Sequence, residues 1–325
     1  MVTAPIARDA VELALVVRGD LVESVHLGHL VVTAPDGSVR TARGDGNVVF
    51  WPRSSVKPMQ AVAMVRDGLD LPDRLLALAA ASHDGAVVHV AGTREILAGT
   101  GLHESDLLNT PDLPYDAVQA AIWRGAGHGP ARVVQNCSGK HAAMLATCVA
   151  NGWDTATYLD LDHPLQRSIA ATITEFTGDE AGLPVTRDGC GAPLFATTLA
   201  GLARALGRVA AAPGTAPGSA EARVARAMSA VPEMVGGPER TNTRLMREIP
   251  GVVAKDGADG VFALGLPDGT GVAFKVLDGA DRPRSAIAVA ALRAVGVDTP
   301  GLDTIGESPI LGGGVPVGEI VAVLS

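Results

Sequence analysis

The chain has few aromatic residues, few cysteines and no excess of positive charge. Phe, Trp and Tyr make up 3% of its 325 residues, so Ala, Val and Leu must fill most of the interior. The formal net charge of −9 argues against nucleic acid or an anionic membrane surface as the main partner, because both attract clustered Lys and Arg. Three cysteines, an odd number, favour a reducing cytoplasm over a disulfide framework.

The sequence also shows neither a signal-peptide pattern nor a membrane-spanning pattern. The first 17 residues contain Arg8, Asp9 and Glu12, which interrupt the apolar core that a signal peptide needs. No apolar run approaches the roughly 20 residues of a membrane-spanning helix. We therefore expect a cytoplasmic protein that has no membrane partner.

Strand signals lie at both ends of the chain and helical periodicity lies between them. Short apolar runs separated by turn residues precede residue 50, and a hairpin pattern returns at residues 260–277. Helical spacing dominates from about residue 56 to 246, and the Pro- and Gly-rich residues 210–218 are expected to form a flexible loop. The order predicts an α/β (α+β) fold whose antiparallel sheet combines both chain ends. Residues 1–50 and 250–325 would form the sheet part and residues 51–249 the helical part of one catalytic unit, 1–325.

The spacing of Ser54 and Lys57 indicates a reaction class. A serine hydroxyl becomes a good nucleophile when a nearby base takes its proton, and an uncharged lysine amine can be that base. Residues i and i+3 are neighbours on a helix, and Pro58 suggests that the helix begins near residues 55–57, with Ser54 and Lys57 partly in a 3₁₀ lead-in. The alternative is that a serine caps this helix and that Lys57 is solvated.

Lys255 and Ser82 extend this motif. A Ser-x-x-Lys sequence followed much later by Lys-x-Gly, here Lys255 to Gly257, is typical of serine acyl-transfer enzymes of the β-lactamase type. Ser54 lies where the first strands give way to helices and Lys255 lies just before the returning hairpin, so both are expected where sheet and helices meet. Ser82 could relay protons between the lysines or simply cap a turn. Lys275 is expected to point to solvent from a strand.

The cysteines suggest a metal site. Cys137 and Cys190 lie in glycine-rich polar segments, whereas Cys148 lies in an apolar helix and is expected to pack in the core. Thiolates are soft ligands that select zinc-like metals, and an imidazole or a neutral amine could complete the site. The candidates for that further ligand are His83, Lys140 and His141. Two buried free thiols are the alternative.

Taken together, these motifs resemble the rhizobial-type L-asparaginases, also called the asparaginase II family, whose fold is similar to that of serine β-lactamases and glutaminases. The resemblance runs from about residue 50 to 280, and its most specific parts are residues 136–142 (NCSGKHA) and 188–193 (DGCGAP). Other matching segments are residues 53–58, 81–85, 163–166, Arg240 with Met246, 255–260 and 275–279. One departure is visible, because Ala86 stands where an acidic residue is expected after Gly85.

The resemblance implies two serine–lysine tandems, Ser54 with Lys57 and Ser82 with Lys255. It also implies a homodimer and a zinc site, with no organic cofactor. The implied zinc ligands are Cys137, Lys140 and Cys190. The implied substrate contacts are Arg53, Asn136, His141 and Asp188.

The implied reaction is the hydrolysis of L-asparagine to L-aspartate and ammonia. Ser54 would attack the side-chain amide carbon, and water would then hydrolyse the acyl-enzyme. For Lys57 to act as the base, its pKa must fall about three units from roughly 10.4, through burial and a second cation such as Lys255. The alternatives are a glutaminase or β-lactamase-like amidohydrolase, and a non-catalytic protein that binds a metal or an amino acid.

Overall fold

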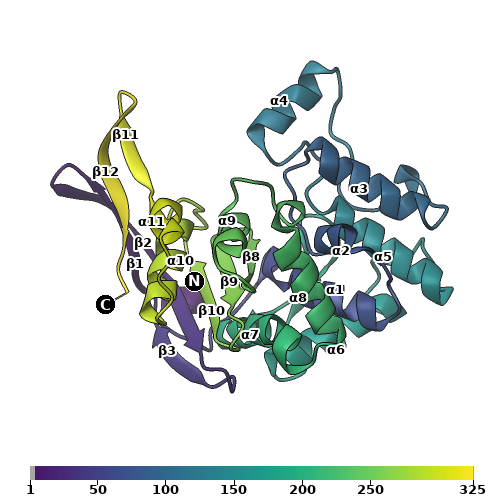
Figure 1. The fold of residues 1–325 in the computed structure, drawn as a ribbon, viewed down its shortest axis with the longest axis horizontal. Helices are drawn as coiled ribbons and strands as arrows, with labels where there is room; N and C mark the ends of the chain where they lie inside the picture. The colour runs from purple at the N-terminus through teal and green to yellow at the C-terminus, as the bar shows by residue number, and fades with distance from the viewer. Residues whose placement is uncertain (1–3, 325) are drawn as a thin grey trace.

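A computed structural model describes residues 4–324 and places one large sheet beside a group of helices (Figure 1). The sheet has eight antiparallel strands in the order β11-β12-β1-β2-β10-β9-β8, with β3 paired to β2. Strands from both chain ends therefore share one sheet, which confirms the predicted fold class. The strands are β1 Val11–Arg18, β2 Leu21–Thr33, β3 Val39–Arg43, β8 Val253–Gly257, β9 Val261–Gly265, β10 Gly271–Val276, β11 Pro309–Gly312 and β12 Val315–Ala322.

The segment between β3 and β8 is largely helical. Its helices are α1 Lys57–Arg66, α2 Asp73–Ala79, α3 Val87–Ala98, α4 Ala117–Gly125, α5 Ser138–Asn151, α6 Pro164–Thr177, α7 Leu199–Thr215, α8 Ala220–Ala230 and α9 Thr241–Glu248. Two small antiparallel pairings join β4 Val49–Phe50 to β7 Thr197–Thr198, and β5 Val185–Arg187 to β6 Pro193–Phe195. Helices α10 Arg284–Ala294 and α11 Gly301–Gly306 follow the hairpin of β9 and β10.

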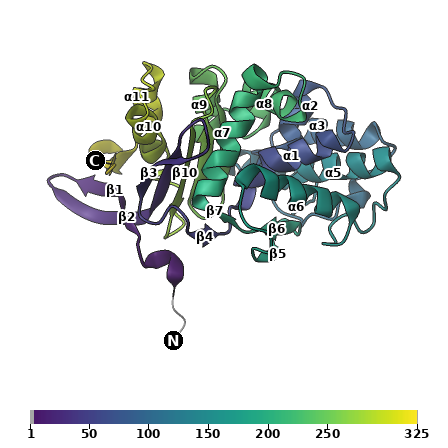
Figure 2. The same ribbon diagram turned by 90° about the horizontal axis from the view of Figure 1, so that it is seen from below.

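Helix α7 connects the helical part to the sheet. It packs against β9, β10 and β2, while α10 and α11 lie on the other side of the sheet (Figure 2). Gly265 permits the close approach of α7, because a side chain there would collide with the carbonyl of Leu206. Lys255 pairs with Ala263, two residues before Gly265, so the alternation of strand side chains places Lys255 on the face that meets α7.

The interior is mostly aliphatic, as the scarcity of aromatic residues predicts, but it also contains three lysines. Lys57, Lys140 and Lys255 are among the largest fully buried side chains of the described residues. Lysine is almost never fully buried without a partner, because removing an ammonium group from water is costly. The positions of these three amines therefore mark a candidate functional site.

The expected loop at residues 210–218 is wrong for most of its length. Helix α7 continues to Thr215 with Pro213 inside it, because Val209, Ala210 and Ala212 are buried against their neighbours. Pro213 lies in the last turn, where it removes only one backbone hydrogen bond. No helix within residues 4–324 is both long enough and apolar enough to span a bilayer.

Candidate active site

Ser54 lies at the junction between the sheet and the first helix. A 3₁₀ turn, Arg53–Val56, leads into α1, and Pro58 occupies the first turn of that helix, as predicted. The neighbouring Ser55 hydroxyl donates to the Pro52 carbonyl at 2.5 Å, and no serine side chain caps α1. The partly exposed Ser54 hydroxyl makes no hydrogen bond to the described residues and is available to a substrate.

The Ser82 hydroxyl connects the two predicted lysines. The Nζ atoms of Lys57 and Lys255 each lie 3.0 Å from Ser82 Oγ, and all three side chains are buried. Lys57 Nζ also donates to a backbone carbonyl and lies 3.0 Å from Cys137 Sγ. The expected contact between Ser54 and Lys57 is not formed, because these three groups already occupy the amine. Ser82 and Lys255, in contrast, are hydrogen-bonded to each other.

The Lys255 amine has a lowered affinity for its proton. Burial lowers the pKa of Lys255 to about 8, and the neighbouring Asp256 carboxylate partly offsets that effect. Lys255 Nζ donates to both the carbonyl oxygen, at 2.7 Å, and the carboxylate of Asp256. Near neutral pH a fraction of the Lys255 side chains is therefore uncharged and can accept a proton through Ser82.

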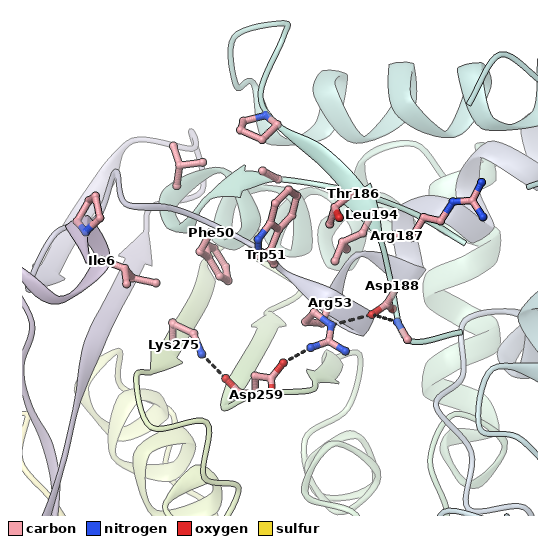
Figure 3. Close-up of a pocket in the computed structure, with 15 residues that line it drawn as sticks. Ile6, Phe50, Trp51, Arg53, Thr186, Arg187, Asp188, Leu194, Asp259 and Lys275 are labelled. Atoms are coloured by element: carbon pink, nitrogen blue, oxygen red, sulfur yellow. Dashed lines mark hydrogen bonds and ion pairs between the residues drawn. The ribbon is translucent and has the colours of Figure 1, made fainter. Parts of the chain in front are cut away.

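Arg53 and Asp188 form an ion pair next to Ser54 (Figure 3). Arg53 Nε donates to Asp188 Oδ1 at 2.7 Å, and a second guanidinium nitrogen contacts the Asp259 carboxylate. The Arg53 backbone has a φ of 52°, a left-handed conformation that costs about 1–2 kcal/mol for a residue with a side chain. Burial would raise the pKa of Asp188, but the charges of Lys140 and Arg53 lower it. Asp188 is therefore ionised, and the pair presents one charge of each sign.

Asn136 and His141 are held by neighbouring protein groups. Asn136 Oδ1 accepts from Gln135 Nε2 at 2.8 Å and from Cys137 Sγ at 3.2 Å. His141 Nδ1 lies 2.8 Å from the Tyr158 hydroxyl, and burial lowers the pKa of His141 well below its usual value. Its Nε2 is buried without a hydrogen-bond partner. His141 is thus a neutral ring with one unsatisfied nitrogen.

Cys137, Lys140 and Cys190 lie together in a buried thiol–amine cluster. Lys140 Nζ donates to Cys190 Sγ at 3.3 Å, and none of the three residues is more than 3% exposed. A hydrogen bond from Cys137 and the charge of Lys140 together lower the pKa of Cys190 well below its usual value. Cys148 packs in the aliphatic core, as predicted. The structure therefore brings together the residues expected to hold a metal.

The donors of this cluster suit zinc, which takes four ligands and accepts both sulfur and nitrogen. Within residues 4–324 no three His, Cys, Asp or Glu side chains are grouped to hold a metal ion, so a metal here depends on Lys140 as a ligand. His141, the next residue of α5, has an unsatisfied Nε2 but is not grouped with the two thiols as a third ligand. The residues present thus fit zinc when the lysine is counted as a ligand.

Comparison with known proteins assigns the chain to a family. The sequence model of the family described as L-asparaginase II matches residues 14–322. The chain belongs to this family. No curated protein matches it.

The chain is also similar, weakly, to several solved structures. A candidate β-lactamase from Bacteroides dorei is 17% identical over 77% of this chain and 84% of that one, with a TM-score of 0.41. A β-lactamase from Mycobacterium bovis is 16% identical over 83% and 95%, with a TM-score of 0.38. Mglu in its L-glutamate-binding form is 15% identical over 82% and 58%, with a TM-score of 0.36. The assignment to the L-asparaginase II family depends on the family match alone.

In this L-asparaginase II chain, a buried charge network continues from Lys255. The Asp256 carboxylate contacts both Lys255 Nζ and a guanidinium nitrogen of Arg240. Arg240 also lies 3.6 Å from the Asp84 carboxylate and 4.3 Å above the Tyr115 ring. The sequence motifs gave these acidic residues no role, although Asp84 and Asp256 each lie within two residues of a predicted catalytic residue. That proximity was the signal that could have found them.

Asp84 is relevant to Ala86, the position where the family pattern leads one to expect an acidic residue. Ala86 precedes α3 and brings no charge to the start of that helix. The Asp84 carboxylate, two residues earlier, contacts Arg240. Burial raises the pKa of Asp84 to about 6, although Arg240 opposes this effect. An acidic side chain is therefore still present near Ser82.

Proposed function

We propose that the protein is an L-asparaginase that hydrolyses L-asparagine to L-aspartate and ammonia through a serine acyl-enzyme. The observation that supports this most directly is the Ser82 hydroxyl held between the buried amines of Lys57 and Lys255, in a chain of the L-asparaginase II family. Amines beside a serine hydroxyl supply the base that serine acyl transfer requires.

In the proposed reaction, Ser54 is the nucleophile because its hydroxyl is the more exposed of the two. The amine of Lys57 takes the Ser54 proton while the Oγ–C bond forms. The C–N bond then breaks as the amide nitrogen takes up a proton and leaves as ammonia. Water attacks the acyl carbon, and Ser54 regains its proton. One helical turn separates Ser54 from Lys57, so substrate binding need only reorient these two side chains. Ser82 passes protons between the two lysines.

The Arg53–Asp188 pair supports an amino acid as the substrate. The guanidinium group can bind an α-carboxylate in a planar, two-pronged contact, and the carboxylate can bind an α-ammonium group. Asn136 and His141 are assigned to the same substrate by the family resemblance. His141 Nε2 is the buried atom that still needs a hydrogen-bond partner.

We assign zinc to the cluster of Cys137, Lys140 and Cys190. A bound zinc ion would act as a Lewis acid that orients the substrate. Elemental analysis of the purified protein is expected to give about one zinc per chain, and Cys190→Ser is expected to lose it. Cys148→Ser is the matched control, because Cys148 packs in the core and should retain the metal. Equal zinc in the Cys190→Ser variant would contradict this assignment.

Ammonia release from L-asparagine and L-glutamine tests the proposed function. Asparagine is expected to be the better substrate. A preference for glutamine would make the protein a glutaminase, and asparagine binding without ammonia release would make it a binding protein.

The pKa of Lys255 predicts that activity rises with pH. Below about pH 8 Lys255 is mostly protonated and cannot accept a proton, whereas above it the amine is mostly neutral. We expect kcat/KM for asparagine to rise about tenfold per pH unit below pH 8 and to level off above it. A kcat/KM profile from roughly pH 6 to 10 measures this, and a profile without a change of slope near pH 8 would count against it.

The oligomeric state and the cellular location are also proposals. The family resemblance suggests a homodimer, and the three free cysteines suit a reducing cytoplasm. A solution mass of about twice the 33.0 kDa of one chain would support the dimer.

A further inference from the structure

A pocket of about 600 Å³ adjoins the proposed active site and is larger than asparagine requires (Figure 3). Ligand pockets commonly have volumes of roughly 300–1,000 Å³ and enclose molecules much larger than one small amino acid. Arg53 and Asp188, the proposed contacts to the amino acid, line this pocket. A substrate held by that pair therefore has open space beside it.

One wall of the pocket is apolar. Phe50 and Trp51 both line it, in a chain with only five Phe and three Trp residues, together with Ile6 and Leu194. Trp51 is 38% exposed, so it does not serve mainly as core packing. A large aromatic side chain at a concave surface provides contact area for an apolar group.

The pocket also contains a cation that lacks a carboxylate partner. Lys275 Nζ donates to the backbone carbonyls of Asp259 and Val276. The two carboxylates whose charges act on Lys275, those of Asp259 and Asp278, contact Arg53 and His26 instead. Among the described residues Lys275 makes no ion pair within 4 Å, so it can bind an anionic group of a ligand. This position differs from the solvent-facing one that the sequence suggested.

The burial of the proposed catalytic groups indicates which end of a larger substrate would lie in the pocket. The proposed proton-transfer groups, Lys57, Ser82 and Lys255, are at most 4% exposed, so the side-chain amide must point inward to react. The pocket can then receive only a group attached at the α-carbon end. The ammonium group of an asparagine is best matched by Asp188, and a distant carboxylate is best matched by Lys275.

We infer that the substrates include dipeptides in which asparagine is followed by an apolar residue. This inference rests on the proposed asparaginase function. In L-asparaginyl-L-leucine, Asp188 would bind the α-ammonium group, Phe50 and Trp51 would contact the leucine side chain, and Lys275 would bind the terminal carboxylate. The reaction consumes water and yields L-aspartyl-L-leucine and ammonia, with the peptide bond left intact.

Ammonia release from L-asparaginyl-L-leucine, L-asparagine and N-acetyl-L-asparagine tests this inference. The wild-type protein is expected to hydrolyse the dipeptide with a kcat/KM within about tenfold of that for asparagine or above it. Trp51→Ala and Lys275→Met are each expected to lower kcat/KM for the dipeptide about tenfold or more and to change that for asparagine less than about twofold. Trp153→Ala is the matched control, because Trp153 lies outside this pocket.

Turnover of asparagine without turnover of the dipeptide would overturn the inference. Equal effects of Trp51→Ala on both substrates, or a preference for N-acetyl-L-asparagine, would do the same. Calorimetric binding of the dipeptide separates this inference from the proposed function. If asparagine itself releases no ammonia, tighter dipeptide binding by the wild type than by Trp51→Ala would still support the pocket assignment, and equal binding would refute it.

Discussion

Replacing Ser54 by alanine is expected to lower ammonia release from L-asparagine by about 10⁴-fold or more, because the acyl-enzyme can no longer form. Ser82→Ala is expected to cost about 10²–10⁴-fold, the usual contribution of a positioned proton-transfer group. The two expected losses of activity differ because the two serines have different proposed roles. Ser82 is 4% exposed and bound by two amines, as a proton-transfer group would be, whereas the Ser54 hydroxyl makes no hydrogen bond to the described residues and is available as the nucleophile. Steady-state rates with asparagine measure both losses.

Ser55→Ala is the matched control for this experiment. The Ser55 hydroxyl is buried and donates only to the Pro52 carbonyl, so its loss should cost about 1 kcal/mol of stability and little activity. Mass spectrometry of the quenched enzyme locates the acyl group. An acyl group on Ser82, or an active Ser54→Ala variant beside an inactive Ser82→Ala variant, would transfer the nucleophile role to Ser82.

Replacing Arg240 by methionine is expected to lower the free energy of unfolding by about 3–5 kcal/mol. Arg240 contacts the Asp256 carboxylate and lies 3.6 Å from that of Asp84, and the side chains of all three are at most 15% exposed. Arg240 keeps the pKa of Asp256 well below its usual value despite burial. Without the guanidinium group, two carboxylates remain buried with less compensating charge. Urea denaturation followed by tryptophan fluorescence measures the loss.

Arg247→Met provides the control on α9, the helix that Arg240 immediately precedes. Arg247 forms an ion pair with Glu233 in which both side chains are more than 40% exposed, so its loss should cost about 1 kcal/mol or less. The double variant Arg240→Met with Asp256→Asn should be more stable than the sum of the two single losses predicts, because the stranded carboxylate is gone. Equal losses for Arg240→Met and Arg247→Met would show that the buried network does not hold the fold together.

The sequence motifs selected residues that the structure brings close together, but they did not predict all of the contacts between them. Ser-x-x-Lys spacing predicted a partnership of Ser54 and Lys57, yet Lys57 is hydrogen-bonded to Ser82. Local spacing describes neighbours on one helix, whereas a buried amine bonds to whichever polar groups surround its tip. Those groups come from the segment after α2 and from the start of α5.

The folding pattern was predictable where the turn signals were strong. The hairpin of β9 and β10 has Pro267, Asp268 and Gly269 at its turn, and both strands lie within the expected residues. Strand β8, which carries Lys255, was not predicted as a strand because its segment contains Lys, Asp and Gly and does not alternate in polarity. Its five residues are all buried because β9 and the helical part cover it.

Composition, periodicity and motifs were sufficient to establish an α/β protein with a sheet made from both chain ends, and to indicate serine–lysine chemistry with a thiol–amine cluster. The contacts of Ser82, the Asp84–Arg240–Asp256 network and the pocket beside Arg53 came from the three-dimensional arrangement. The physical reason is that hydrogen bonds and charges act over a few ångströms, between side chains that are far apart in the chain: 173 positions for Ser82 and Lys255, and 206 for Arg53 and Asp259.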